Sequence, residues 1–346
     1  MQLRPYQQYG IEDALEFLRT SPVGARRMYV APTGTGKGVI QRCLREKIVG
    51  AGYRCILLAP NREIARNWGS PDWVMTPVRF RNQLERGAIV PPEVILVDEA
   101  HHDVGSNISY GDIFLMCATS TRFIGFTATP FRGTPKGTQA LRELWGKPVW
   151  LLRLPEACKN GWIQLPSVVI EPLVDDDKLV VQNGEFVIKS ANAATADRLE
   201  ALADLVRQFL GTRQIVALPS TQGTLAFGRY LEDAGIEHRI VLQNTPPAER
   251  TEAYEACKNG VPLLQIRILS EGVDFPWLET LIDARPTMSP VLWLQTFGRL
   301  TRPWDCEKTY VCTNRNLERH AYLLEGAVPP QVISESQKAF GGPSIR

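Results

Sequence analysis

The sequence has little of what defines several protein classes. Its seven cysteines never occur in a CxxC spacing, which argues against a zinc site and against a disulfide framework. No apolar run reaches the length of a membrane span, and the start, MQLRPYQQYG, lacks the apolar region of a signal peptide. Lys and Arg number 39 against 37 Asp and Glu, so no strong overall field attracts nucleic acid. We therefore expect a soluble cytoplasmic protein in which any nucleic-acid binding is locally arranged.

The order of apolar segments indicates an α/β fold in two parts. The 346 residues favour two domains of ordinary size. Strand-like runs such as RRMYVA, CILLAP and EVILVDE alternate with helical patterns at 39–49 and 62–68, which predicts a parallel sheet. The pattern weakens after residue 150, and a second βα series follows, with its first helix expected at 195–210. We predict two similar lobes, 1–152 and 153–328, with a ligand cleft between them, and a loosely attached tail at 329–346.

A glycine-rich segment, APTGTGKG, lies between an expected strand and an expected helix. Such a turn aims backbone N–H groups at phosphate oxygens, and its lysine, here Lys37, neutralises the β/γ charge. The segment departs from the strict phosphate-loop pattern at Ala31, in place of the first glycine, and at Gly38, in place of the Ser or Thr whose hydroxyl ligates Mg²⁺. An ordinary glycine-rich turn is the alternative interpretation of this segment taken alone. The phosphate-binding interpretation nominates Thr33, Gly34, Thr35, Gly36, Lys37 and Gly38.

An acidic pair at the end of the strand EVILV supports nucleotide hydrolysis. We expect Asp98 to hold Mg²⁺ and Glu99 to orient the attacking water. The alternative is a strand that ends in an acidic turn. Because Gly38 brings no hydroxyl, the ion must rely on Asp98, phosphate oxygens and its own waters. We therefore predict weakened metal binding, and a lower Mg²⁺ requirement after Gly38→Thr.

Two arginines in QTFGRLTR are candidates for arginine fingers. Arg299 and Arg302 are three residues apart, so we expect both on one helix face, directed across a cleft at a γ-phosphate. Gln295 is expected on the same face one turn earlier. A basic helix end that caps its own carbonyl groups is the alternative.

The motifs together resemble the superfamily 2 helicases and translocases, and the resemblance extends from Leu3 to Arg302. LRPYQ looks like the adenine-reading segment of that family, CILLAPNREIA like motif Ia, VMTPVRF like motif Ib and GFTATPFR like motif III. In the second half ALPST resembles motif IV, LSEGVDFP motif V and QTFGRLTR motif VI. The combination is most similar to the DEAH-containing branch of excision-repair and type III restriction helicases.

The resemblance implies a fold and further site residues. It implies two tandem RecA-like domains, with ATP and Mg²⁺ bound in the cleft. Adenine or nucleotide contacts then fall to Arg4, Gln7, Gly272 and Asp274, with Gln295, Arg299 and Arg302 around the γ-phosphate. By the same resemblance, His101, Thr127 and Thr129 couple the two lobes. The residues expected to bind nucleic acid are Pro60, Arg62, Thr76, Ser220 and Thr221.

The function expected from these motifs is an ATP-dependent helicase or translocase, a nucleic-acid-stimulated ATP hydrolase. We expect DNA, single-stranded or branched, as its track. RNA is the first alternative, and a nucleotide-gated clamp with weak turnover, motivated by Gly38, is the second. A subunit role in a larger repair, recombination or restriction complex is also compatible with the sequence, and no membrane partner is expected.

Overall fold

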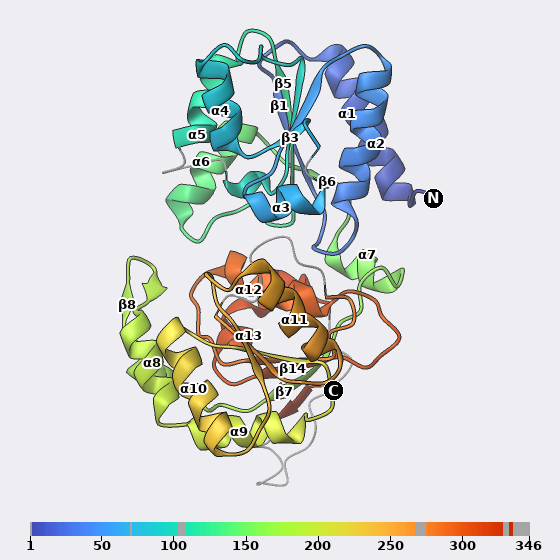
Figure 1. The fold of residues 1–346 in the computed structure, drawn as a ribbon. Helices are drawn as coiled ribbons and strands as arrows, with labels where there is room; N and C mark the ends of the chain where they lie inside the picture. Colours follow the sequence, from blue (N-terminus) through green and yellow to red (C-terminus); the bar gives the residue numbers. More distant parts are fainter. Residues whose placement is uncertain (1, 70, 103–107, 267–274, 328–331, 335–346) are drawn as a thin grey trace. The chain divides into compact units, whose positions relative to one another are not determined.

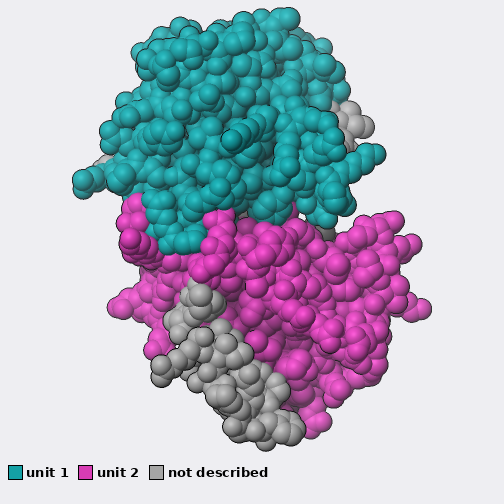
Figure 2. Space-filling view, turned by 180° about the vertical axis from the view of Figure 1, so that it is seen from behind, with its two compact units in different colours: residues 1–157, 270–273 teal, residues 158–269, 274–346 magenta. Residues whose placement is uncertain are grey.

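The computed structural model describes residues 2–69, 71–102, 108–266, 275–327 and 332–334, and these fall into two compact units that divide at Ala157 and Cys158. Figure 2 colours the units separately. The sequence indicated a boundary between 152 and 153. The helix α7 (Leu154–Lys159) contains the division.

The first unit is built on one parallel six-stranded sheet (Figure 1), in the order β3-β2-β4-β5-β1-β6. Its central strand β4 (Val94–Val97) reads VILV and is buried throughout, as a strand covered on both faces should be. The other strands are β1 (Arg26–Val30), β2 (Cys55–Leu58), β3 (Val74–Met75), β5 (Arg122–Thr127) and β6 (Val149–Trp150). The helices are α1 (Pro5–Thr20), α2 (Lys37–Gly50), α3 (Arg62–Asn67), α4 (Pro77–Glu85), α5 (Ile108–Met116), α6 (Pro135–Trp145) and a 3₁₀ turn η1 (Ala100–His102).

The second unit repeats this architecture around a seven-stranded parallel sheet, in the order β11-β12-β10-β13-β14-β7-β15. Its strands are β7 (Ser167–Ile170), β10 (Gln214–Ala217), β11 (Arg239–Val241), β12 (Leu263–Gln265), β13 (Thr280–Asp283), β14 (Thr309–Cys312) and β15 (Val332–Ser334). Its helices are α8 (Ile188–Ala196), α9 (Leu199–Gln208), α10 (Thr221–Asp233), α11 (Pro247–Lys258), α12 (Pro290–Leu300) and α13 (Asn316–His320). The 3₁₀ turns η2 (Asp176–Lys178) and η3 (Ala321–Leu324) and a small antiparallel hairpin of β8 (Val181–Gln182) and β9 (Glu185–Phe186) complete it.

The α/β class and the two tandem RecA-like parallel sheets are therefore confirmed. Two details differ from expectation. The helix expected at 195–210 is two helices, because α8 ends at Ala196 and α9 begins at Leu199. Within the tail expected to be loosely attached, Val332–Ser334 forms the edge strand β15 and pairs with β7, which satisfies backbone groups of β7 that an open sheet edge would expose. No helix in the described part of the chain is long and apolar enough to cross a membrane.

Candidate nucleotide site and helicase motifs

The expected phosphate loop follows β1 and ends at the first residue of α2. Gly34 and Gly36 have φ values of 81° and 94°, which L side chains rarely adopt. A β-carbon on Gly36 would also lie 2.8 Å from Gln7 Nε2. Lys37 opens α2, and its ammonium donates to the carbonyls of Ala31 (3.1 Å) and Pro32 (3.3 Å). The loop thus has the glycine conformations and the lysine position that a phosphate cradle needs.

The segment expected to read adenine packs against this loop. Gln7 is 3% exposed, and its Nε2 lies 3.4 Å from the carbonyl oxygens of both Thr35 and Gly36. Tyr6 Oη donates to the Thr35 carbonyl, and Arg4 Nη1 lies 3.4 Å from the same oxygen. Arg4 also precedes α1 as its N-cap residue, where its N–H donates to Gln7 Oε1 at 2.9 Å. In the described structure, Arg4 and Gln7 therefore hold the shape of the loop, and a contact with adenine remains a prediction.

The acidic pair lies at the same edge of the sheet as the loop. Asp98 follows β4, and β4 and β1 both pair in parallel with β5, so their carboxyl ends share one edge. Glu99 has a φ of 47°, an uncommon conformation for a residue with a side chain and one that occurs often at functional sites. Asp98 Oδ1 accepts from the Glu99 N–H at 3.1 Å and from Gln41 Nε2 at 3.1 Å.

The two carboxyl groups have opposite electrostatic surroundings. Burial, and then the negative charge of Glu99, raise the pKa of Asp98. Burial also acts to raise the pKa of Glu99, but the hydrogen bond with His101 and the charge of Lys37 prevail and lower it. One carboxylate of the pair, Glu99, therefore stays charged, which suits a group that accepts a hydrogen bond from a water molecule and orients it.

The residues around Asp98 fit a magnesium ion. Mg²⁺ prefers oxygen ligands and is commonly held by one or two carboxylates, phosphates and water. Asp98 offers the carboxylate, and the buried Oε1 of Gln41 has no hydrogen-bond partner among the described residues. A group of three His, Cys, Asp or Glu side chains able to hold a metal without phosphate does not occur in the described ranges.

The three expected coupling residues lie together beneath this pair. His101 Nδ1 is 2.9 Å from Thr127 Oγ1 and 3.4 Å from Glu99 Oε2. Thr127 Oγ1 also accepts from the Thr129 N–H at 3.0 Å. All three coupling residues are buried, at 1% exposure or less. The structure therefore connects the acidic pair to the end of β5 through His101, and the coupling role itself stays a prediction.

The expected nucleic-acid residues lie just after strands, and two of them cap helices. In the first unit Pro60 and Arg62 follow β2 and Thr76 follows β3, its neighbour in the sheet. Thr76 Oγ1 accepts from the Arg79 N–H at 3.4 Å, at the start of α4. In the second unit Ser220 Oγ accepts from the Gly223 N–H at 3.0 Å, at the start of α10.

Of these residues, Arg62 and Thr221 are the most exposed. The Thr76 and Ser220 hydroxyls are already engaged in local caps, which is the ordinary role of such residues. Contacts with nucleic acid therefore remain predictions for all five.

Helix α12 carries the expected arginine-finger motif and corrects one expectation about it. Arg299 lies on α12 and is 9% exposed, and Gln295 is half-buried one turn earlier. Arg302 lies beyond the helix, which ends at Leu300, so the expected common helix face of the two arginines is wrong. The cause is Pro303, because a residue before proline disfavours the helical conformation. Burial lowers the pKa of the Arg302 guanidinium to about 10.

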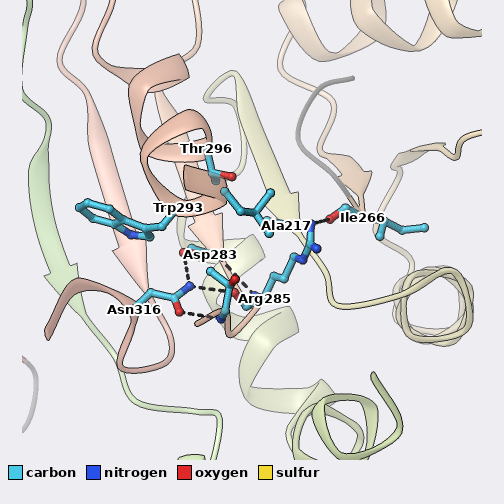
Figure 3. Close-up of a pocket in the computed structure, with 9 residues that line it drawn as sticks. Ala217, Ile266, Asp283, Arg285, Trp293, Thr296 and Asn316 are labelled. Atoms are coloured by element: carbon cyan, nitrogen blue, oxygen red, sulfur yellow. Dashed lines mark hydrogen bonds between the residues drawn. The ribbon is translucent and has the colours of Figure 1, made fainter. Parts of the chain in front are cut away.

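A small pocket in the second unit was not predicted (Figure 3). It lies at the carboxyl ends of the neighbouring strands β12, β10 and β13, against α12. The Asp283 carboxylate there is 2% exposed and accepts from Tyr310 Oη at 2.5 Å and from Asn316 Nδ2 at 2.9 Å. Arg285 Nη1 donates to the carbonyl of Ile266 at 3.1 Å, just before the segment 267–274. The motif V residues Gly272 and Asp274 lie in that segment, outside the described residues.

Sequence comparisons agree with the motifs. Residues 197–303 match the family described as the helicase conserved C-terminal domain. A "51.5 kDa protein" of a Lactococcus phage (isolate 7-9) is 27% identical over 314 residues, covering 86% of this chain and 67% of the phage protein. A Saccharomyces cerevisiae protein provisionally named ATP-dependent helicase IRC3 is 26% identical over 353 residues, covering 86% of this chain. This chain spans only 49% of that yeast protein.

Solved structures share the fold at low sequence identity. A fragment of a provisionally assigned HsdR subunit of a type I restriction enzyme from Vibrio vulnificus YJ016 has a TM-score of 0.72 and 18% identity, covering 96% of this chain and 68% of the fragment. The type ISP restriction-modification enzyme LlaBIII bound to DNA has a TM-score of 0.67 and 14% identity, covering 96% of this chain and 31% of that enzyme. S. cerevisiae Dbp5 bound to RNA and ADP BeF3 has a TM-score of 0.62 and 16% identity, covering 97% of this chain and 95% of Dbp5.

These neighbours by themselves establish the fold. The match over residues 197–303 makes the second half of the chain similar to the helicase conserved C-terminal domain, and the ordered motifs along the chain resemble those of superfamily 2 helicases.

Proposed function

We propose that this chain is an ATP-dependent nucleic-acid motor that acts on DNA. The observation that carries the proposal is the meeting of Lys37, Asp98 and Glu99 at one edge of the first sheet, with Glu99 in a left-handed conformation. A loop lysine beside two carboxyl groups, one placed to hold Mg²⁺ and one to orient water, is an arrangement used in nucleotide hydrolysis.

Each residue has a definite part in the proposed reaction. Lys37 exchanges its contacts with loop carbonyls for the β/γ-phosphate oxygens, and backbone N–H groups of the loop hold the remaining charge. Bound Mg²⁺ would neutralise phosphate oxygens, and Asp98 is the side chain that would hold it. Glu99 orients the attacking water and accepts its proton, while His101 fixes the position of the Glu99 carboxylate. Arg299 and Arg302 are the candidates to stabilise charge on the γ-phosphate.

Support for DNA as the track comes from the restriction enzymes among the structural neighbours, one of them bound to DNA. Dbp5 bound to RNA is the neighbour that supports the alternative, an RNA helicase. The motor would translocate by closing and opening its two lobes as ATP is hydrolysed. It would act alone or within a larger repair, recombination or restriction complex.

The test is ATP hydrolysis measured in parallel with single-stranded DNA, duplex DNA, branched DNA and RNA at one stated salt concentration. We expect stimulation by DNA, and a Glu99→Gln variant that loses roughly 10²- to 10⁴-fold of the stimulated rate. Glu143→Gln, on an exposed position of α6, is the matched control and should retain the full rate. If RNA alone stimulates ATP hydrolysis, the track is RNA and the proposal of DNA is wrong.

One observation favours a second candidate, a nucleotide-gated clamp. Gly38 lacks the hydroxyl that ligates Mg²⁺ in the strict motif, and a clamp can bind nucleotide without fast turnover. If Glu99→Gln binds ATP and nucleic acid normally and its slow phosphate release equals that of the unsubstituted chain, the clamp is correct and the motor is not.

A further inference from the structure

Gln41 occupies an unusual position for a polar residue. It lies on α2 four residues after Lys37, its side chain is fully buried, and it donates from Nε2 to Asp98 Oδ1 at 3.1 Å. The amide orientation follows from chemistry, because a carboxylate oxygen accepts hydrogen bonds and would repel the amide oxygen. The Oε1 atom is therefore the end of the amide that does not face the carboxylate.

The Oε1 atom is buried without a hydrogen-bond partner among the described residues. A buried carbonyl without a donor costs free energy, and native proteins keep such groups rarely and usually with a reason, such as an ion or an ordered water. Gln41 is thus an unpartnered buried oxygen on a side chain that already contacts the expected metal-holding carboxylate.

The geometry of α2 relates Gln41 to the missing hydroxyl at position 38. Residues three apart on a helix lie on one face, and long side chains lean toward the helix N-terminus. The Gln41 side chain therefore extends toward the turn of α2 that begins at Gly38. In the strict motif, a Ser or Thr hydroxyl after the lysine ligates Mg²⁺.

We propose that Gln41 takes over the task of the absent hydroxyl. Its Nε2 holds the Asp98 carboxylate, and its Oε1 accepts a hydrogen bond from a water molecule in the Mg²⁺ shell when nucleotide is bound. Mg²⁺ keeps several waters in protein sites, so an amide oxygen can act on the ion through one of them. Gln41 is in this sense a positioning residue, and the inference rests on the proposed nucleotide-binding function.

The test measures equilibrium binding of a fluorescent ADP analogue to the full chain as Mg²⁺ is varied, with a second titration in EDTA. Gln41→Met has nearly the same length but no polar atoms in its place. We expect it to raise the Mg²⁺ concentration for half-maximal binding by roughly 10- to 100-fold, the range for loss of an outer-shell partner. Binding in EDTA should stay unchanged. Gln139→Met, at an exposed glutamine on α6, is the matched control.

A rescue experiment restores a hydroxyl at position 38 in the Gln41→Met variant. A β-carbon at position 38 would lie 3.7 Å from Trp68 Cζ2, an ordinary contact, so serine fits there. Gly38→Ser combined with Gln41→Met should recover most of the lost Mg²⁺ affinity, whereas Gly38→Ala with Gln41→Met should recover none. In the chain that retains Gln41, Gly38→Ser should change the Mg²⁺ requirement by less than about threefold, because Gln41 already fills this role. This outcome replaces the expectation from the sequence alone that a hydroxyl at position 38 lowers the Mg²⁺ requirement.

The outcomes separate the inference from the function. An unchanged Mg²⁺ requirement in Gln41→Met, with Mg²⁺-dependent binding in the unsubstituted chain, overturns the role of Gln41 and leaves the motor intact. Equal weakening of nucleotide binding in Mg²⁺ and in EDTA overturns the role of Gln41 as well, because Gln41 would then only stabilise the structure of the loop. A chain that binds no nucleotide under any condition refutes the proposed function and the inference together. If Gln41→Met does not fold, Gln41→Asn, which keeps the amide but shortens it, must show the same rise.

Discussion

The hydroxyl oxygen of Thr127 contacts two of the groups that surround the acidic pair. Thr127 ends β5, is fully buried, and its Oγ1 lies 2.9 Å from His101 Nδ1 and accepts from the Thr129 N–H at 3.0 Å. Valine has the same shape but replaces this hydroxyl with a methyl group. Thr127→Val therefore removes both contacts without leaving a cavity.

The cost follows from the two partners that remain. The buried Thr129 N–H loses its acceptor, which costs about 1–3 kcal/mol, and the contact with His101 is worth about 0.5–1.5 kcal/mol. The added methyl group returns about 0.8 kcal/mol by apolar burial. We expect Thr127→Val to lower the free energy of unfolding by about 1–4 kcal/mol. Because His101 also contacts Glu99, the stimulation of ATP hydrolysis by nucleic acid should fall more than the basal rate.

Urea denaturation of the full chain, followed by circular dichroism, measures the first effect, and hydrolysis with and without DNA measures the second. Thr127→Ser is the control, because it keeps the hydroxyl and loses one buried methyl group, for about 1 kcal/mol. A valine variant within about 0.5 kcal/mol of the unsubstituted chain, or a serine variant that loses its stimulation as fully as the valine variant, would refute the reasoning.

Three further predictions follow from burial. Tyr310→Phe removes a donor to Asp283 and should destabilise the second unit by about 1–3 kcal/mol in a denaturation experiment. Gly125→Ala would place a β-carbon 2.8 Å from Trp145 Cη2 and should cost about 1–3 kcal/mol through overpacking, measured in the same way; an unchanged midpoint would contradict the packing. Titration of the native protein with a thiol reagent should leave four buried cysteines unmodified until the chain unfolds, since burial also raises the pKa of each: Cys55, Cys117, Cys257 and Cys312.

The fold was predictable to the extent that it rests on local patterns. A fully apolar segment such as VILV, bounded by turns, is buried on both faces and marks a central parallel strand. The break between α8 and α9 was not predictable in this way, because helical periodicity continues across a short interruption. Arg198 has a φ of −128° and a ψ of 17°, a local departure from helix that the single turn-favouring residue before it, Asp197, does not by itself predict. The pairing of β15 with β7 depends on an edge that exists only after the sheet has formed.

In the candidate site too, residues that belong to local motifs were predictable, and a residue whose partner is distant in the sequence was not. Lys37, Asp98 and Glu99 were predictable because each follows directly from a strand-and-turn motif. Gln41 was not predicted, because its partner Asp98 is 57 positions away in the chain. One signal could have found it. Gln41 falls in the apolar stripe of α2 with Leu44 and Ile48, at spacings of three and four residues.

A polar residue in such a stripe must find a partner when the helix packs on its sheet, because burying an amide without one is costly. The end of α2 that follows the phosphate loop packs where the strands end, and there the described structure gives Gln41 the carboxylate of Asp98, which follows β4. A buried glutamine at this position of α2, together with the missing hydroxyl at Gly38, is therefore a combination that a sequence can be searched for. The same pairing of a missing ligand with a buried amide one turn later can be sought in other phosphate loops.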